Sequence, residues 1–120
     1  MLYLVLASFV FTGALCYDAK YDELDVDKIL ADDAVFMSYL NCFLDKGPCT
    51  EQHAEDFKNI LPEVVKEACG KCSVDQKPKM RKIVNTLFAK KPDLAVEFQK
   101  KYDPNHEYEA EFTAFLLAAN

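Results

Sequence analysis

Four cysteines are the residues of this 120-residue chain whose type and spacing offer distinctive chemistry. They are Cys42, Cys49, Cys69 and Cys72. In an oxidising compartment four thiols form two disulfides, and three pairings are possible. In a reducing compartment the same thiols are candidates for a metal site or a redox pair. The surrounding sequence helps to decide between these uses.

The spacing favours two local bridges between neighbouring cysteines. Cys42 falls near the end of a predicted helix, and Cys49 follows the turn-forming residues 45–48, so a bridge would join this helix end to the next segment. Cys69 and Cys72 stand three residues apart where we expect a helix to stop, so they can also meet. Such short loops stabilise a fold by only about 2–2.5 kcal/mol each, because little loop-closure entropy is removed.

Two other uses of these cysteines are less consistent with the sequence. A zinc site of four thiolates accepts Cys69 and Cys72 as one half, but the six residues between Cys42 and Cys49 do not suit the other half. A redox dithiol needs a helix N-terminus to lower its pKa, whereas Cys69 follows the apolar stripe before it. We therefore expect structural disulfides, no metal and no cofactor.

The remaining polar residues form no catalytic constellation. The two histidines, His53 and His106, fall in no metal-binding motif. The three serines, Ser8, Ser38 and Ser73, fall in no nucleophile motif. Acidic residues are numerous but scattered, as on solvated helix faces. We predict that the protein is not an enzyme.

Residues 1–16 have the pattern of a signal peptide. Positions 2–15 carry no charge, and this run is shorter than the roughly 20 residues that span a bilayer. Ala14 and Cys16 are small residues that permit cleavage before Tyr17. Cleavage there removes a fifth cysteine and leaves an even number for an oxidising compartment. We therefore expect a secreted, extracellular protein with no stable membrane insertion.

Composition and charge narrow the class of partner. The chain is 51% hydrophobic and 28% charged, with only 3 Gly and 5 Pro, which is typical of one globular domain. Its formal net charge is -6, and its one dense basic stretch, 77–82, has acidic segments on both sides. Nucleic-acid binding needs clustered positive charge, so we expect no nucleic-acid partner.

Apolar residues recur at intervals of three and four, which predicts an all-α protein of about six short amphipathic helices. The stripes lie within 27–30, 36–44, 57–68, 80–88, 94–102 and 108–119. Residues 73–76 form a predicted capping box, and Pro92 suits the first position of a helix. A turn follows at 103–105. No run alternates as a strand would.

The ends of the second and third helices are also suggested by local signals. Asp32 or Asp33 is the predicted N-cap of the second helix, and Gly47 is its predicted terminator. Thr50 is a candidate start of the third helix. Pro62 either kinks that helix or marks a later start.

Short helices with wide apolar faces pack as a shell more easily than as a tight bundle. The chain contains 9 Phe and 6 Tyr, so its apolar side chains are large. A space left between such rings destabilises the fold unless a guest fills it. The pattern is therefore compatible with an apolar channel that binds a linear apolar molecule.

Six segments resemble the insect chemosensory proteins, the four-cysteine soluble carriers of the OS-D type. They are KYD at 20–22, VDKIL at 26–30, YLNCFLDKGPCT at 39–50, LPE at 61–63, CGKC at 69–72 and KYDP at 101–104. The first cysteine pair with Gly-Pro between its members, together with the later Lys-Tyr-Asp-Pro, is specific to this family. The resemblance covers essentially the whole chain after residue 16.

The resemblance implies about six helices around an apolar channel, bridges between adjacent cysteines, and binding of long-chain or aromatic semiochemicals and lipids. It places Tyr21 and Tyr39 at or near the channel. Three departures stand out: an extra residue within 51–59, Ala95 where the family often has Trp, and 105–106 where it often has Gly. The missing Trp leads us to expect a wider pocket near Ala95.

Together these patterns predict that residues 17–120 form the single ligand-binding domain of a secreted, monomeric carrier for a small apolar molecule. The predicted ligand-binding residues are Tyr21, Ile29, Phe36, Tyr39, Leu40, Phe43, Leu61, Val64, Val65, Ile83, Leu87, Phe98 and Tyr102. Tyr21, Tyr39 or Tyr102 can give a ligand's polar head one hydrogen bond. The alternative is a secreted helical module that binds a protein or lipid surface and has no dedicated cavity; an exposed apolar patch would favour it.

Overall fold

The computed structural model describes residues 17–118 and confirms an all-α fold with six α-helices in that range. The elements are η1 (Ala19–Glu23, a short 3-10 helix), α2 (Val26–Ala31), α3 (Asp33–Phe43), α4 (Ala54–Lys66), α5 (Gln76–Lys90), α6 (Pro92–Tyr102) and α7 (Glu109–Leu117). The described part of the chain contains no strand and no helix that is long and apolar enough to cross a membrane. The predicted signal peptide lies outside the described residues. The sequence does not predict η1, because five residues are too few to show a period.

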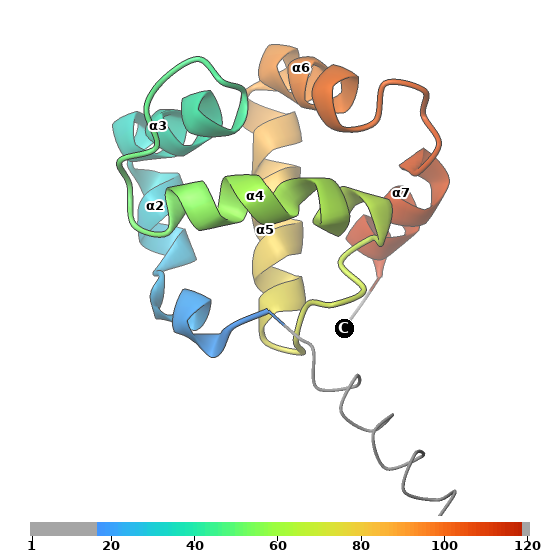
Figure 1. Ribbon diagram of the computed structural model, residues 1–120, viewed down its shortest axis with the longest axis horizontal. Helices are drawn as coiled ribbons and strands as arrows, with labels where there is room; N and C mark the ends of the chain where they lie inside the picture. The colour runs from blue at the N-terminus through green and yellow to red at the C-terminus, as the bar shows by residue number, and fades with distance from the viewer. Residues whose placement is uncertain (1–16, 119–120) are drawn as a thin grey trace, which may run out of the picture.

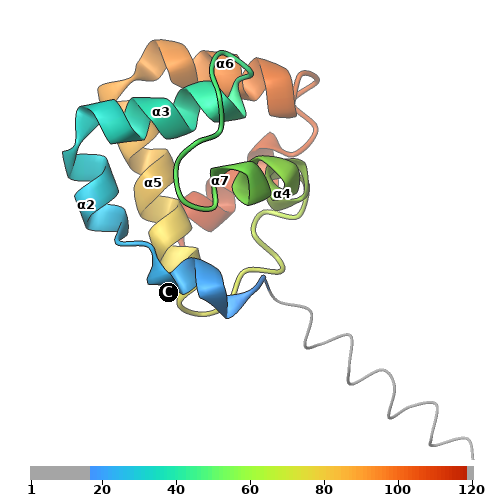
Figure 2. The same ribbon diagram turned by 60° about the vertical axis from the view of Figure 1, so that its left-hand side comes forward.

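Helix α5 runs through the middle of the domain, and the other helices surround it (Figure 1). It contacts α2, α6 and α7, while α3 contacts α2 and α4. Helix α4 crosses in front of α5 in this view (Figure 1). Turning the molecule shows α3 and α6 at the same end of α5 and η1 beside the other end (Figure 2).

The predicted starts of α3, α5 and α6 are confirmed. Asp32 is the N-cap of α3, and its carboxylate accepts the N–H of Val35 at 3.3 Å. Ser73 and Gln76 form the capping box: the Ser73 N–H donates to the Gln76 side chain at 2.9 Å, and the Gln76 N–H donates to the Ser73 hydroxyl at 3.1 Å. Pro92 is the first residue of α6, a position whose N–H would have no partner within the helix, so the N–H that proline lacks is not missed.

The predicted terminator of α3 is wrong. The helix ends at Phe43, and Asp45 rather than Gly47 takes the left-handed backbone, with φ of 62°. The Lys46 N–H donates to the Asn41 carbonyl at 2.7 Å, which completes a Schellman motif. Asp45 tolerates this conformation better than most non-glycine residues do.

The predicted limits of α4 are wrong as well. It begins at Ala54 rather than Thr50, because Cys49 is bridged to α3 and the following residues form a turn that ends at His53, with φ of 60°. Pro62 lies inside the helix, so it does not mark a later start.

The helix α4 ends at Lys66 instead of near Gly70. Ala68 takes φ of 50°, and the Cys69 N–H donates to the Val64 carbonyl at 2.9 Å in a second Schellman motif. Gly70 does not supply the left-handed residue. Its role is close approach, since a Cβ there would lie 3.1 Å from a backbone oxygen at the helix end.

The turn after α6 contains the position, 105–106, where the family often has Gly. His106 adopts φ of 57°, a conformation that glycine takes without strain. The buried carboxylate of Asp103 holds the turn, because it accepts the N–H groups of Glu107 at 2.8 Å and Tyr108 at 3.2 Å.

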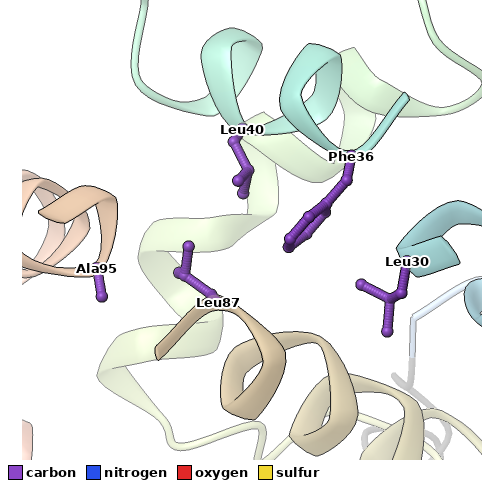
Figure 3. Close-up of a cluster of buried hydrophobic side chains, with 5 residues drawn as sticks. All are labelled: Leu30, Phe36, Leu40, Leu87 and Ala95. Carbon is purple, nitrogen blue, oxygen red and sulfur yellow. The ribbon is translucent and has the colours of Figure 1, made fainter. Parts of the chain in front are cut away.

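The main apolar core joins α2, α3, α5 and α6 (Figure 3). Its buried residues are Leu30, Phe36, Leu40, Leu87 and Ala95. Ala95 is only 3% exposed, because α6 packs closely enough for a methyl group to fill its position. The expected wider pocket near Ala95 is therefore not found: this residue belongs to the packed core.

Both disulfides join neighbouring cysteines, as the spacing favours. Cys42 is bonded to Cys49, and Cys69 is bonded to Cys72. Cys42 and Cys69 are fully buried in two smaller apolar clusters, so each bridge is packed as well as covalent. Within residues 17–118, no three His, Cys, Asp or Glu side chains come together as they would around a metal ion.

Replacing Cys42 and Cys49 together by alanine is expected to lower the free energy of unfolding by about 2–3 kcal/mol, because the loop-closure constraint and some packing are lost. The helical fold should survive, since the bridge spans only 7 residues of sequence. Urea unfolding followed by far-UV circular dichroism measures both effects. Loss of the helical spectrum without urea would show that the bridge does more than clip one corner.

Asp45 links three helices through its carboxylate. Lys101 of α6 and Lys58 of α4 both form ion pairs with it at the end of α3. Their hydrogen bonds, that of Lys101 first, lower the pKa of Asp45 from 3.8 to about 2. The charged form is thus favoured by folding.

Asp45→Asn should therefore be less stable than the wild type at neutral pH, and the difference should disappear as the pH falls to about 2. The sign follows from the lowered pKa: the stabilisation is present above the unfolded-state value and is lost as the folded-state carboxylate is protonated. Urea midpoints measured across the acid range test this. A difference that stays constant with pH would contradict it.

Candidate functional site

A cavity of about 130 Å³ lies between the helices and is partly open to solvent. Residues from η1, α2, α3, α4 and α5 line it. The lining is apolar except for tyrosine hydroxyls and three polar side chains, Asp22, Gln76 and Lys79. Such a hollow, apolar with a few polar groups, is the usual form of a small-molecule site.

Eight of the thirteen predicted ligand-binding residues line this cavity. They are Tyr21, Ile29, Phe36, Tyr39, Leu40, Phe43, Val64 and Ile83. The other five, Leu61, Val65, Leu87, Phe98 and Tyr102, lie outside the lining. The contact of the eight with a ligand stays a prediction.

The face of α4 that lines the cavity differs from the predicted one. Phe57, Ile60 and Val64 line it, at intervals of three and four residues. Leu61 and Val65 each come one residue later, which turns a helical side chain by about 100° around the axis. Both lie within the apolar stripe of the sequence, so the rotation of α4 cannot be read from the pattern.

Three residues of α5 and α6 that were predicted to bind the ligand pack against neighbouring helices beside the cavity instead of lining it. Leu87 lies one turn beyond Ile83 and is buried in the main core. The Phe98 ring lies 6.4 Å from that of Phe43 and 5.8 Å from that of Tyr102. The Tyr102 hydroxyl donates to the Phe43 carbonyl at 2.6 Å, and burial raises the pKa of Tyr102 to about 12. This contact closes α6 onto α3.

The sequence reasoning missed several lining residues. The apolar ones are Leu24, Val26, Leu30, Phe57, Ile60, Cys72 and Met80, and Tyr17 joins them. Phe57, Ile60 and Met80 belong to recognised stripes, so periodicity places them on apolar faces without saying which face meets the cavity. The polar residues Asp22, Gln76 and Lys79 give no such signal.

An aromatic cluster closes the cavity at the start of α4. The Tyr21 ring lies 5.0 Å from that of Phe57 and 5.2 Å from that of His53. The buried Tyr39 donates its hydroxyl proton to the Gln52 carbonyl at 2.7 Å. Burial, and secondarily the charge of a nearby glutamate, raise the pKa of Tyr39, which keeps its phenol neutral. The Tyr39 hydroxyl therefore already donates its one proton to a hydrogen bond within the protein.

Tyr17 closes the cavity on the side of the second disulfide. Its hydroxyl donates to Glu63 at 2.8 Å, and Lys71 donates to the other oxygen of Glu63 at 2.7 Å. Burial and then the hydrogen bond to Glu63 raise the pKa of Tyr17. The hydrogen bond from Lys71, followed by that from Tyr17, lowers the pKa of Glu63. The three side chains fasten the segment before η1 to α4.

The fold and cavity define a class: a small helical protein with two local disulfides and an apolar cavity that is partly open to solvent. The chain belongs to the insect pheromone-binding family A10/OS-D, whose sequence model matches residues 17–110. The resemblance to the OS-D-like chemosensory proteins is thereby confirmed.

Individual relatives agree with this membership. The chain is 37% identical over 103 residues to ejaculatory bulb-specific protein 3 of Drosophila melanogaster, covering 86% of this chain and 81% of that protein. It resembles the structure of a chemosensory protein in complex with bromo-dodecanol, with a TM-score of 0.73, 26% identity, and coverage of 82% and 97% of the two chains. It also resembles the antennal chemosensory protein A6 of the moth Mamestra brassicae, with a TM-score of 0.66, 25% identity, and coverage of 83% and 92%.

Proposed function

We propose that this protein is a soluble carrier that binds a small apolar molecule in the cavity lined by η1, α2, α3, α4 and α5. The observation that carries the proposal is the cavity itself, with apolar side chains from five elements around about 130 Å³. The bromo-dodecanol in the structure of the similar chemosensory protein is an apolar chain with one polar end, and it supports the same ligand class here.

Binding follows from partition between water and the cavity. Each methylene group that leaves water contributes about 0.8 kcal/mol. The cavity of about 130 Å³ has room for several such groups. A longer chain displaces side chains of the lining, so that its further methylene groups also leave water.

The setting of this function is also part of the proposal. The carrier is secreted after cleavage before Tyr17, which leaves four cysteines, all of them in disulfides. It acts as a monomer in the extracellular fluid.

The interaction-module alternative has less support. The large apolar side chains that are most exposed, Val74, Phe88, Val96 and Leu117, come from four different segments of the chain. The cavity gathers more apolar side chains than this around one partly enclosed space. An enclosed apolar site favours a carrier, whereas a contiguous exposed patch would favour a protein or lipid surface.

Displacement of a neutral fluorescent probe tests the carrier function. N-phenyl-1-naphthylamine is expected to bind the oxidised protein saturably, and octan-1-ol, decan-1-ol and dodecan-1-ol should displace it. Affinity should rise severalfold with each added methylene group, as burial of apolar surface requires. Absence of saturable binding by the oxidised protein, or affinities independent of chain length, would overturn the proposal.

A further inference from the structure

The polar side chains of the cavity lining are gathered at one end. Asp22 belongs to η1, and Gln76 and Lys79 belong to the first turns of α5. These two elements lie side by side at the lower end of the domain (Figure 2), and Lys79 donates to the Asp22 carbonyl at 3.3 Å. The rest of the lining is aliphatic, aromatic or sulfur-containing. An amphiphile in the cavity would therefore turn its polar head toward η1 and α5.

Most polar groups near the cavity are already engaged. The Gln76 amide nitrogen faces the Tyr17 carbonyl at 3.3 Å and the Asp18 carbonyl and Asp22 carboxylate at 3.4 Å. Its carbonyl oxygen accepts the Ser73 N–H. With all these partners, Gln76 has little left to offer a ligand.

The tyrosines that the sequence suggested as partners for a polar head are engaged too. The hydroxyl of Tyr39 donates to a backbone carbonyl, and Tyr102 donates to another outside the cavity. Burial, and then the nearby charge of Asp56, raise the pKa of the Tyr21 phenol. The hydroxyls of Tyr39 and Tyr102 therefore stabilise the wall rather than bind a ligand.

Lys79 differs from these groups because its positive charge is not paired with a carboxylate among the described residues. Among the described residues no carboxylate forms an ion pair with it, and its one hydrogen bond goes to the Asp22 carbonyl. An ammonium group has three donors, so two remain. The neighbouring Lys82, one turn later, pairs with Asp27 and does not line the cavity.

We propose that Lys79 binds the carboxylate head of a long-chain acid, so that this carrier prefers an ionised fatty acid to the alcohol of the same length. This inference rests on the proposed carrier function and names its ligand class. The Asp22 carboxylate opposes an anionic head, but its hydrogen bond from Gln76 draws it into the protein network. The Lys79 ammonium, which forms no ion pair among the described residues, therefore sets the preference.

The decisive experiment compares dodecanoic acid with dodecan-1-ol at neutral pH, with displacement of N-phenyl-1-naphthylamine as the readout. Wild-type protein should bind the acid about tenfold more tightly than the alcohol, as a charge-assisted hydrogen bond in a partly solvated site allows. Lys79→Met keeps the length of the side chain and removes the charge. This variant should bind the acid about tenfold more weakly, and its affinity for the alcohol should change by less than about twofold.

Two further variants keep the test decisive. Lys82→Met removes a lysine of the same helix outside the cavity and should leave both affinities unchanged. Asp22→Asn removes the opposing charge. It should raise the affinity for the acid about threefold and leave the affinity for the alcohol unchanged. If circular dichroism shows that Lys79→Met does not fold, two other measurements test the inference. They are the preference of the wild type for the acid over the alcohol and the gain in acid affinity of Asp22→Asn.

The outcomes separate this inference from the carrier function. An equal loss for acid and alcohol in Lys79→Met would overturn the inference, because it would show that only the lysine stem packs against the ligand. Equal or weaker binding of the acid by the wild type would overturn it as well. In both cases saturable binding of dodecan-1-ol leaves the carrier function standing. If neither compound binds the wild type, both proposals fail.

Discussion

Replacement of Phe36 by alanine is expected to lower the free energy of unfolding by about 3–5 kcal/mol, more than any surface substitution. Phe36 is 3% exposed and lies at the centre of the main core, where side chains from four helices converge (Figure 3). It also lines the cavity, so the space left by its ring adds to an existing hollow that neighbours cannot fill. Urea unfolding followed by circular dichroism measures the loss.

Phe88→Ala is the matched control for this prediction. The same side chain is removed from α5, but Phe88 is 53% exposed and contributes less buried surface. Its loss should lower the free energy of unfolding by less than about 1 kcal/mol. Similar losses for Phe36→Ala and Phe88→Ala would contradict the placement of the core.

Replacement of Ile60 by tryptophan is expected to weaken binding of an apolar probe at least about tenfold. Ile60 lines the cavity from α4, and an indole ring there occupies the space of several ligand methylene groups. Loss of only two buried methylene groups corresponds to about 1.6 kcal/mol, which already accounts for a tenfold effect. Saturation binding of N-phenyl-1-naphthylamine measures the change.

Leu61→Trp provides the control from the next position of the same helix. Leu61 is also half-buried, but it does not line the cavity, so its replacement should change probe affinity by less than about twofold. Thermal unfolding of both variants shows whether either ring disturbs the fold. A larger loss of affinity in Leu61→Trp than in Ile60→Trp would mean that the face of α4 that carries Leu61 meets the ligand.

A filled cavity should also raise the stability of the domain. A ligand that binds only the folded state increases the free energy of unfolding with its concentration. The stabilisation should be absent in Ile60→Trp at ligand concentrations that stabilise the wild type. This gives the binding measurements an independent check.

Helix starts could be predicted where the signal is local. The Asp32 cap and the capping box of Ser73 and Gln76 depend on residues within one turn, so short sequence segments specify them. Helix ends were harder. Asp45 and Ala68 adopt the left-handed backbone without being glycines, because packing, ion pairs and disulfides around them hold the chain there.

The cavity shows the same division. Apolar periodicity identified the helical faces, and eight predicted residues line the hollow. The rotation of α4 that brings Ile60 rather than Leu61 to the cavity depends on how the helices pack against one another. The polar end depends on a contact between Asp22 and Lys79, which are 57 residues apart in sequence.

By itself the sequence determined an all-α chain, its family and the pairing of Cys42 with Cys49 and of Cys69 with Cys72, because periodicity and short spacing are local properties. Only the tertiary structure decided what those bridges hold: two buried corners beside a cavity whose lining comes from five separate elements. The physical reason is that a cavity is space left by packing, and no single segment encodes it.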